Sequence, residues 1–248
     1  MQDNLRFTYH GTSAENVESI LENGLLPREA TGKSNWANSD VESIQDHVYL
    51  TRQHGIAFGI SATGSDEDVA LIEVDLSRLR PTNLYPDEDY IEQATNRFGL
   101  NPHDGFNGDL AMQDRTEQVR NNIDDYRAAW GDSMNTMGTM SHKGKIPPHA
   151  ISRVSTMDLS GWFKLNIDPT FSIELGLAPT EKYEVMTEIV MGEDVSPERY
   201  IEATFPGDLE QLAQANGKTA DYMASMERDA KKIVNADFFN VQENPKYE

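Results

Sequence analysis

The residues His10, Gly11 and Thr12 are the first in the chain whose types could do chemistry. An imidazole can hold or transfer a proton near neutral pH. A glycine lets the backbone turn sharply and leaves room for a ligand. The pattern therefore indicates a ligand-binding corner. The alternative interpretation is a histidine that only ends a strand before a helix.

The flanking residues predict the elements that would hold this corner. Leu5 to Tyr9 has the β-branched and aromatic content of a short strand. Thr12 and Glu15 stand at the spacing of a capping box, which favours the start of a helix at this point. Gly24 follows where a left-handed C-cap is expected. The sequence therefore predicts a strand, a sharp corner and an amphipathic helix.

Further along, apolar runs of strand or helical spacing alternate with polar segments, so the sequence predicts a mixed α+β fold. We expect strands at His47–Thr51, Val69–Leu76, Ile151–Thr156 and Tyr183–Met191, and another after a turn within Gly192–Ile201. We expect helices at Gly55–Ala62, Ile91–Phe98, Asp114–Trp130, Asp208–Ala215 and Thr219–Asn235. A flexible loop is expected at Gly131–Met140 and a frayed end at Asn240–Glu248.

The order of strand, His-Gly-Thr, capped helix, Asn-Gly-Leu and proline resembles the opening of the ADP-ribosyltransferase fold. Diphtheria-toxin-like toxins, poly-ADP-ribose polymerases and RNA 2′-phosphotransferases share that fold. The Tyr-Leu-Thr at residues 49–51 is similar to its second signature. The resemblance implies a split antiparallel β-sheet core with peripheral helices and a helical insertion. It covers residues 5 to 205 with gaps, outside the central insertion.

The resemblance also implies roles for the first two segments. His10, Gly11 and Thr12 would bind NAD through the imidazole and the backbone at the glycine. Tyr49 would stack on the nicotinamide ring, whose positive charge attracts an aromatic face. A tyrosine that only packs in the core is the alternative for Tyr49.

A glutamate opening a late strand is the third signature of the fold, and Glu188 is our assignment for it. Glu184 is the fallback, because alternation along a strand puts it on the same face. Breaking the bond between nicotinamide and ribose develops positive charge at the sugar carbon, which a carboxylate stabilises. Nicotinamide already carries the leaving charge, so the reaction needs neither a general acid nor a metal. A rim carboxylate without chemistry is the alternative.

Three other stretches could contact a ligand. Asn83–Tyr90 alternates acids with aromatic residues, but it matches no calcium-loop spacing, and we interpret it as a solvated turn. Ser141–Ile151 gathers two lysines and two histidines. That cluster could guide a pyrophosphate or an acidic target, or it could be a turn between late strands. The polar residues 28–46 are expected to form a loop or short helix over the site.

The composition limits the classes of partner. Lys and Arg number 21 against 42 Asp and Glu, a net charge of −21, so the average surface repels phosphate backbones and anionic membranes. The absence of cysteine excludes disulfides, thiolate metal sites and a cysteine nucleophile. No run approaches the roughly 18 apolar residues of a membrane span, and the start lacks the pattern of a signal peptide. We expect a cytoplasmic protein, or one delivered into a target cell, without a membrane partner.

These observations predict a catalytic domain at 1–205, with a polar helical insertion at about 91–140, and a helical extension at 206–248. The expected function is a mono-ADP-ribosyltransferase that moves ADP-ribose from NAD to a protein or a nucleic acid. Such an enzyme would act as a toxin, defence or phage effector, with an inhibitor or antitoxin as a further partner. The alternatives are an NAD glycohydrolase, an inert binding module, and an RNA 2′-phosphotransferase, whose second histidine is replaced here by Tyr49.

Overall fold

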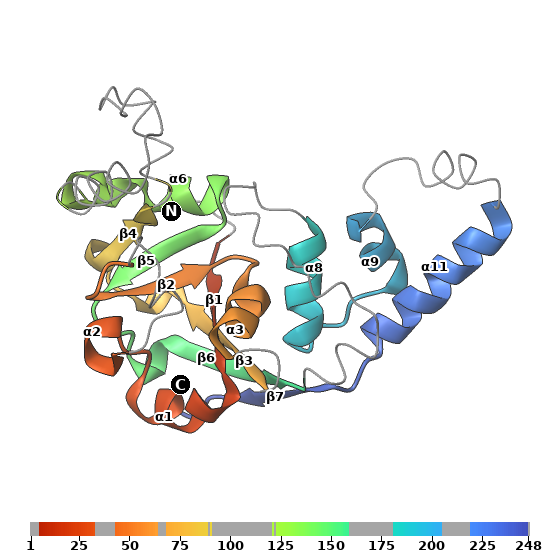
Figure 1. Ribbon diagram of the computed structural model, residues 1–248, viewed down its shortest axis with the longest axis horizontal. Helices are drawn as coiled ribbons and strands as arrows, with labels where there is room; N and C mark the ends of the chain where they lie inside the picture. The colour runs from red at the N-terminus through yellow and green to blue at the C-terminus, as the bar shows by residue number, and fades with distance from the viewer. Residues whose placement is uncertain are drawn as a thin grey trace.

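The computed structural model describes residues 5–32, 43–63, 68–88, 90, 121, 123–158, 181–204 and 219–247. These residues contain a seven-stranded sheet in the order β4-β5-β2-β1-β3-β6-β7, in which every neighbouring pair is antiparallel (Figure 1). The strands are β1 Phe7–Ser13, β2 His47–Thr51, β3 Val69–Asp75, β4 Leu84–Pro86, β5 Thr139–Lys143, β6 Ile151–Met157 and β7 Phe239–Glu243. The α-helices are α1 Val17–Asn23, α2 Arg28–Thr31, α3 Gly55–Thr63, α6 Trp130–Thr136, α8 Glu181–Val190, α9 Pro197–Thr204 and α11 Thr219–Val234. Short 3-10 helices are η1 Ala14–Asn16, η2 Leu76–Arg78, η3 Pro81–Asn83, η4 Arg127–Ala129 and η5 Pro148–Ala150.

The architecture confirms the predicted α+β class. The predicted strand at His47–Thr51 matches β2, and those at Val69–Leu76 and Ile151–Thr156 match β3 and β6 to within one residue. The predicted helices after β2 and near the C-terminus match α3 and α11. The predicted helices Ile91–Phe98 and Asp208–Ala215 lie outside the described residues. Of the predicted helix Asp114–Trp130, residues 121 and 123–130 are described and helical, and the rest lie outside the described residues.

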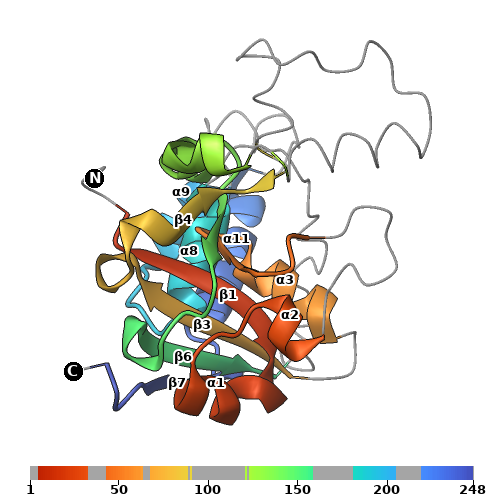
Figure 2. The same ribbon diagram turned by 90° about the vertical axis from the view of Figure 1, so that its left-hand side faces the viewer.

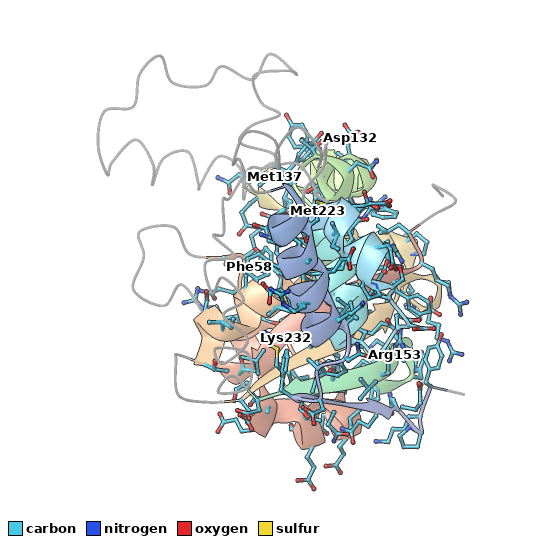
Figure 3. All side chains as sticks on the ribbon, turned by 90° about the vertical axis from the view of Figure 1, so that its right-hand side faces the viewer. Phe58, Asp132, Met137, Arg153, Met223 and Lys232 are labelled. Carbon is cyan, nitrogen blue, oxygen red and sulfur yellow. The ribbon has the colours of Figure 1, made fainter. Side chains whose placement is uncertain are left out.

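Strand β3 separates two apolar cores because its residues alternate between the faces of the sheet. Ile72 faces a core that includes Ile20 of α1 and Met134 of α6. Leu71 faces a second core that includes Val185 of α8 and Ile233 of α11. Figures 2 and 3 show the molecule from two opposite sides, with α11 nearest the viewer in Figure 3 and behind the strands in Figure 2.

The predicted strand at Tyr183–Met191 is wrong, because this segment forms helix α8. Its apolar residues come in pairs four positions apart: Val185 and Met186, then Ile189 and Val190, all buried. That spacing puts them on one helical stripe, which packs on the sheet. Neighbouring residues of a strand point to opposite faces, so adjacent apolar pairs of this kind favour a helix over a strand with one buried face.

The strand predicted within Gly192–Ile201 is wrong for a clearer reason. Pro197–Thr204 forms helix α9, and the hydroxyl of Ser196 accepts a hydrogen bond from the N–H of Arg199 at 3.2 Å. A serine N-cap followed by proline at the first helical position is a strong helix start. The capping residues at its start therefore favour a helix over the predicted strand in this segment.

Four smaller expectations also need correction. The loop expected at Gly131–Met140 is most of helix α6 and the start of β5. The expected frayed end begins with strand β7, which pairs with β6. Asn83–Tyr90 contains strand β4. The helix after β1 is capped by Ser13, whose hydroxyl accepts from the N–H of Glu15 at 3.3 Å, and not by the hydroxyl of Thr12.

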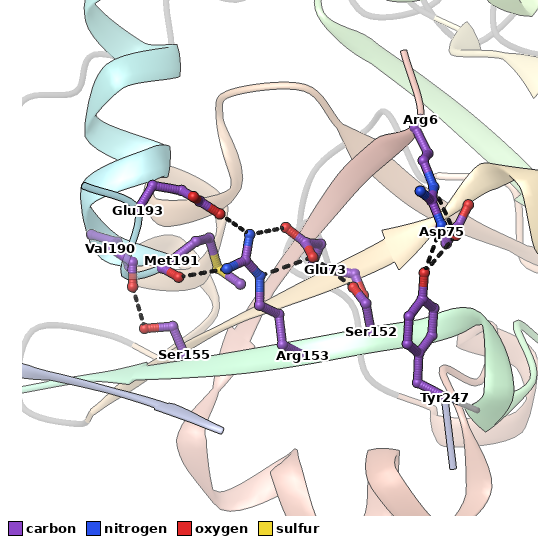
Figure 4. A network of polar contacts seen from close by, with 10 residues as sticks. All are labelled: Arg6, Glu73, Asp75, Ser152, Arg153, Ser155, Val190, Met191, Glu193 and Tyr247. Carbon is purple, nitrogen blue, oxygen red and sulfur yellow. Dashed lines mark hydrogen bonds and ion pairs between the residues drawn. The ribbon is translucent and has the colours of Figure 1, made fainter. Parts of the chain in front are cut away.

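A polar network fastens the C-terminal end of α8 to the sheet (Figure 4). Arg153 of β6 donates to the carbonyl of Met191 at 3.1 Å and to the buried carboxylate of Glu73 at 2.9 Å. Ser155 donates to the carbonyl of Val190 at 2.6 Å. These bonds satisfy carbonyls at the helix end and so fix α8 against the strands.

Candidate active site at the junction of strands β1 and β2

Strands β1 and β2 are neighbours in the sheet but pair at a single position, where Tyr9 lies opposite Thr51. On its other edge, β1 pairs with β3 over its whole length, from Phe7 to Ser13. The half of β1 that contains His10 therefore has one unpaired edge in the described ladder. We call this stretch, in which β1 and β2 are not paired by a described ladder, the opening between the two strands.

The register shows which backbone groups face this opening. The N–H of Ala14 donates to Asp68 and the N–H of Leu76 donates to Arg6, both at 2.9 Å. In an antiparallel ladder such bonds involve every second residue of a strand. The even-numbered residues of β1 thus bond to β3, and the N–H and C=O of Gly11 point towards the opening.

The side chain of His10 crosses from β1 to β2. Its Nδ1 lies 2.9 Å from the carbonyl oxygen of Tyr49, so Nδ1 carries the hydrogen and donates. Burial lowers the pKa of His10, while the bond to Tyr49 acts in the opposite direction. The ring is therefore neutral near pH 7, and Nε2 is left as a hydrogen-bond acceptor.

Gly11 has a structural reason to be glycine as well. A Cβ atom here would lie 1.8 Å from the carbonyl oxygen of Gly55 and 2.5 Å from the backbone nitrogen of Gly59. Helix α3 thus packs directly on the backbone of β1. The hydroxyl of Thr12 accepts from the side-chain amide of Asn16 at 3.1 Å, so it already has a local role.

Tyr49 is held by its phenol. The hydroxyl donates to the carboxylate of Glu88, whose oxygens lie at 2.6 and 2.5 Å, and accepts from the N–H of Ile44 at 2.8 Å. Burial and the nearby charges of Glu88 and Asp87 raise the pKa of the Tyr49 phenol well above its usual value. The phenol stays protonated, and its role is to fix the aromatic ring.

Glu88 is the residue of this site that the sequence did not reveal. It lies in the stretch interpreted as a solvated turn, yet Glu88 and its neighbour Asp87 are only 7% and 8% exposed. The signal that could have found it is the apolar pair Leu84 and Tyr85 before it, which forms β4 and draws the following acids inward. Glu88 is the carboxylate in contact with Tyr49.

Glu188 and Glu184 lie on α8 and bind arginines. Glu188 pairs with Arg199 through two contacts of 2.8 and 2.7 Å, and Glu184 pairs with Arg52 at 2.7 Å. Burial is the main cause that raises the pKa of Tyr9, and the charges of Glu73 and Glu188 add to it. The structure joins His10 to Tyr49, but it gives Glu188 no contact with either within the described residues.

The positive cluster predicted at Ser141–Ile151 is dispersed by the fold. His142 is buried in β5, where burial lowers its pKa, and its Nδ1 bonds to the carbonyl of Gly144 at 3.1 Å. The ammonium of Lys143 lies 3.7 Å from a carboxylate oxygen of Asp46. The stretch is a strand followed by a turn, as in the structural alternative.

Comparisons with known proteins add little to this geometry. No protein-family model and no curated protein matches the sequence. Among solved structures, the chain is similar to EcPltA with a TM-score of 0.33 and 14% identity, over 63% of this chain and 78% of that one. A likeness at this level carries no argument about fold or function. In the described part of the chain, no helix has the length and apolar content needed to cross a membrane.

Proposed function

We propose that this protein is a mono-ADP-ribosyltransferase that binds NAD at the junction of β1 and β2. The opening between the two strands carries the proposal. Its edge offers the N–H and C=O of Gly11, and the neutral ring of His10 spans it. The carboxamide of nicotinamide has one acceptor and two donors, so it complements a backbone N–H and C=O pair.

The ring of Tyr49 supports the placement of the nicotinamide. Its hydroxyl is already engaged by Glu88 and Ile44, so the ring face is what the side chain offers to a ligand. A cationic ring gains roughly 1 to 2 kcal/mol from an aromatic face when both are desolvated. The carboxylate of Glu88 next to this ring adds attraction for the same positive charge.

Two glutamates are candidates for stabilising the charge that develops on ribose. Glu188 follows from the resemblance to the fold, and Glu88 follows from its contact with Tyr49. A positioned carboxylate lowers the barrier by electrostatic stabilisation of the oxocarbenium-like transition state and can orient the nucleophile. We propose a protein or a nucleic acid as the acceptor, and an inhibitor that covers the site as a partner.

The first test measures nicotinamide release from NAD by the purified protein, followed by labelled NAD in a lysate treated with protease or nuclease. Transfer of label to a polymer is the expected result. E88Q and E188Q are matched variants, since each removes one charge and keeps the shape. The variant that binds NAD but releases no nicotinamide identifies the catalytic carboxylate. Full release by both would contradict a role for either glutamate.

The same assay separates the other reactions. Nicotinamide release without labelled polymer indicates an NAD glycohydrolase. Removal of phosphate from 2′-phosphorylated RNA indicates an RNA 2′-phosphotransferase.

An inert NAD-binding module of the same fold is the second candidate. It is favoured by the ion pairs that engage both α8 glutamates: Glu184 with Arg52 and Glu188 with Arg199. A carboxylate in a salt bridge presents a weaker field to a cationic transition state. Measured NAD binding with no nicotinamide release under any condition would identify this function.

A further inference from the structure

The face of the sheet that carries the Tyr49 ring is lined by hydroxyl groups. In the β2–β5 ladder, Thr51 lies opposite Thr139 and Tyr49 lies opposite Ser141. Directly opposed residues of an antiparallel pair share a face. Thr139 is therefore a diagonal neighbour of Tyr49, at a separation that an aromatic side chain can bridge.

Three of these hydroxyls are fully engaged within the protein. That of Thr51 donates to the carbonyl of Gly138 at 2.8 Å and accepts from the N–H groups of Gln53 and His54 at 3.2 and 3.0 Å. A hydroxyl has one hydrogen to donate and two lone pairs, so Thr51 has no capacity left.

Ser141 is satisfied in a similar way. Its hydroxyl donates to the carbonyl of Pro86 at 3.2 Å and lies 2.9 Å from Nδ1 of His47. The phenol of Tyr49 is engaged by Glu88 and Ile44, as described above.

Thr139 is different. It is only 6% exposed, and its hydroxyl oxygen is buried without a hydrogen-bond partner in the described structure. Its natural cross-strand partner would be Thr51, which is saturated. A buried hydroxyl without a partner costs free energy, and native proteins rarely keep one without a reason.

From this we infer that Thr139 binds the substrate. Its hydroxyl forms a hydrogen bond to a neutral polar group of the nicotinamide riboside whose ring stacks on Tyr49. The group is the carboxamide or a ribose hydroxyl of the nicotinamide riboside half of NAD. This inference rests on the proposed function, since it assigns a further residue to the same site. The stability lost in the free protein is recovered when the ligand supplies the missing partner.

Thr8 provides a matched control. Its hydroxyl is also buried without a partner in the described structure, and the residue is 0% exposed. Thr8 lies opposite Val74 of β3, in register with the apolar core that contains Ile72, and not on the face of Tyr49. Thr8 shares this face with His10, but the face is opposite to the one that carries the Tyr49 ring, so Thr8 is not expected to contact a group stacked on Tyr49.

The test compares T139V and T8V, which both replace a hydroxyl by a methyl of the same size. Each variant should melt at the same temperature as the wild type or slightly higher, because an unsatisfied polar group is removed. NAD affinity, measured by calorimetry, should fall about three- to tenfold in T139V, as for one lost hydrogen bond, and stay unchanged in T8V. T139S restores the hydroxyl and should restore affinity.

Each other outcome overturns a specific statement. Unchanged NAD affinity in T139V, with a wild type that binds NAD, would overturn the inference alone. A melting temperature lowered in T139V but not in T8V would show that the hydroxyl has a partner inside the protein, which also overturns it. No NAD binding by the wild type would overturn the proposed function itself. Free nicotinamide and ADP-ribose, used as separate ligands, show whether the carboxamide or the ribose makes the contact.

Discussion

Two regions of this acidic protein bind their carboxylates in different ways. Around β4 and α6, tyrosine phenols donate to acids: Tyr49 to Glu88, Tyr85 to Asp124 and Tyr90 to Asp132. Around α8 and β6, arginines do so: Arg52 to Glu184, Arg199 to Glu188 and Arg153 to Glu73. We name these the tyrosine region and the arginine region.

The difference matters for the candidate site. A phenol donates a hydrogen bond without bringing a charge, so its carboxylate keeps a negative field, whereas an arginine cancels that field at close range. The Tyr49 ring lies in the tyrosine region, where a cationic nicotinamide would be attracted. The two glutamates chosen from the sequence lie in the arginine region. The comparison thus favours Glu88 as the first carboxylate to test.

The largest loss of stability is expected in the arginine region, where one ion pair has a buried carboxylate. Glu73 is 2% exposed and binds Arg153 through two contacts of 2.9 and 3.0 Å. R153M would leave this carboxylate without its cation and should lower the free energy of unfolding by about 3 to 5 kcal/mol. Urea denaturation measures this change in the free energy of unfolding. A loss below 1 kcal/mol would show that the neighbouring Ser152 alone satisfies Glu73.

The tyrosine region should be the more sensitive to mild acid. His47 is buried, and burial lowers its pKa to about 4 from an ordinary value near 6.5. The unfolded chain binds the proton first as pH falls, so stability is complete above about pH 6.5 and is lost as pH falls towards 4. The loss should reach about 3 kcal/mol. In urea denaturation at pH 7, 5.5 and 4.5, the wild type should therefore lose more stability than H47Q as pH falls, and equal losses would contradict this assignment.

Within the tyrosine region, the burial of the bound carboxylate should decide how much stability is lost when a phenol hydroxyl is removed. Y49F removes a donor to Glu88 and the acceptor of the Ile44 N–H, and should lower stability by about 2 kcal/mol. Y85F removes the bond to Asp124, which is exposed, and should cost about 0.5 kcal/mol. Equal losses in urea denaturation would mean that the burial of the carboxylate is not what distinguishes the two pairs.

The smallest effect is expected for the exposed pair of the arginine region. The side chains of Arg52 and Glu184 are 36% and 28% exposed, so water and salt screen their attraction. R52M should change the free energy of unfolding by less than about 1 kcal/mol, and less still in 0.5 M salt. A larger, salt-independent loss in thermal melting would assign Arg52 a packing role.

The sequence predicted the elements whose signals are local. Strand β2 with Tyr49, and the central strand β3, follow from β-branched and aromatic residues between turn signals. Helix α8 was predicted as a strand because its segment is rich in Val, Ile, Thr and Tyr, which favour strands, and because the resembled fold has a strand with a glutamate there. The serine and proline that start α9 stand next to each other in the sequence. Giving more weight to these capping residues would have predicted the helix.

The site itself was predictable only in part. His10 and Tyr49 were chosen because their segments resemble two signatures of the ADP-ribosyltransferase fold, and the imidazole of His10 bonds to the backbone carbonyl of Tyr49. Glu88 was missed because the local signal for its burial was only the apolar pair Leu84 and Tyr85, and its partner Tyr49 lies 39 positions away. The opening between β1 and β2 depends on where pairing stops, which no single residue signals.

The contact of Gly11 with Gly55 and Gly59 has a mechanical consequence. Strand and helix touch backbone to backbone, so there is no intervening side chain whose rotamer could absorb a displacement. A shift of α3 must be passed to β1 almost undiminished, and with it to the imidazole of His10. A molecule that binds against α3 would therefore change the geometry of the candidate site at His10.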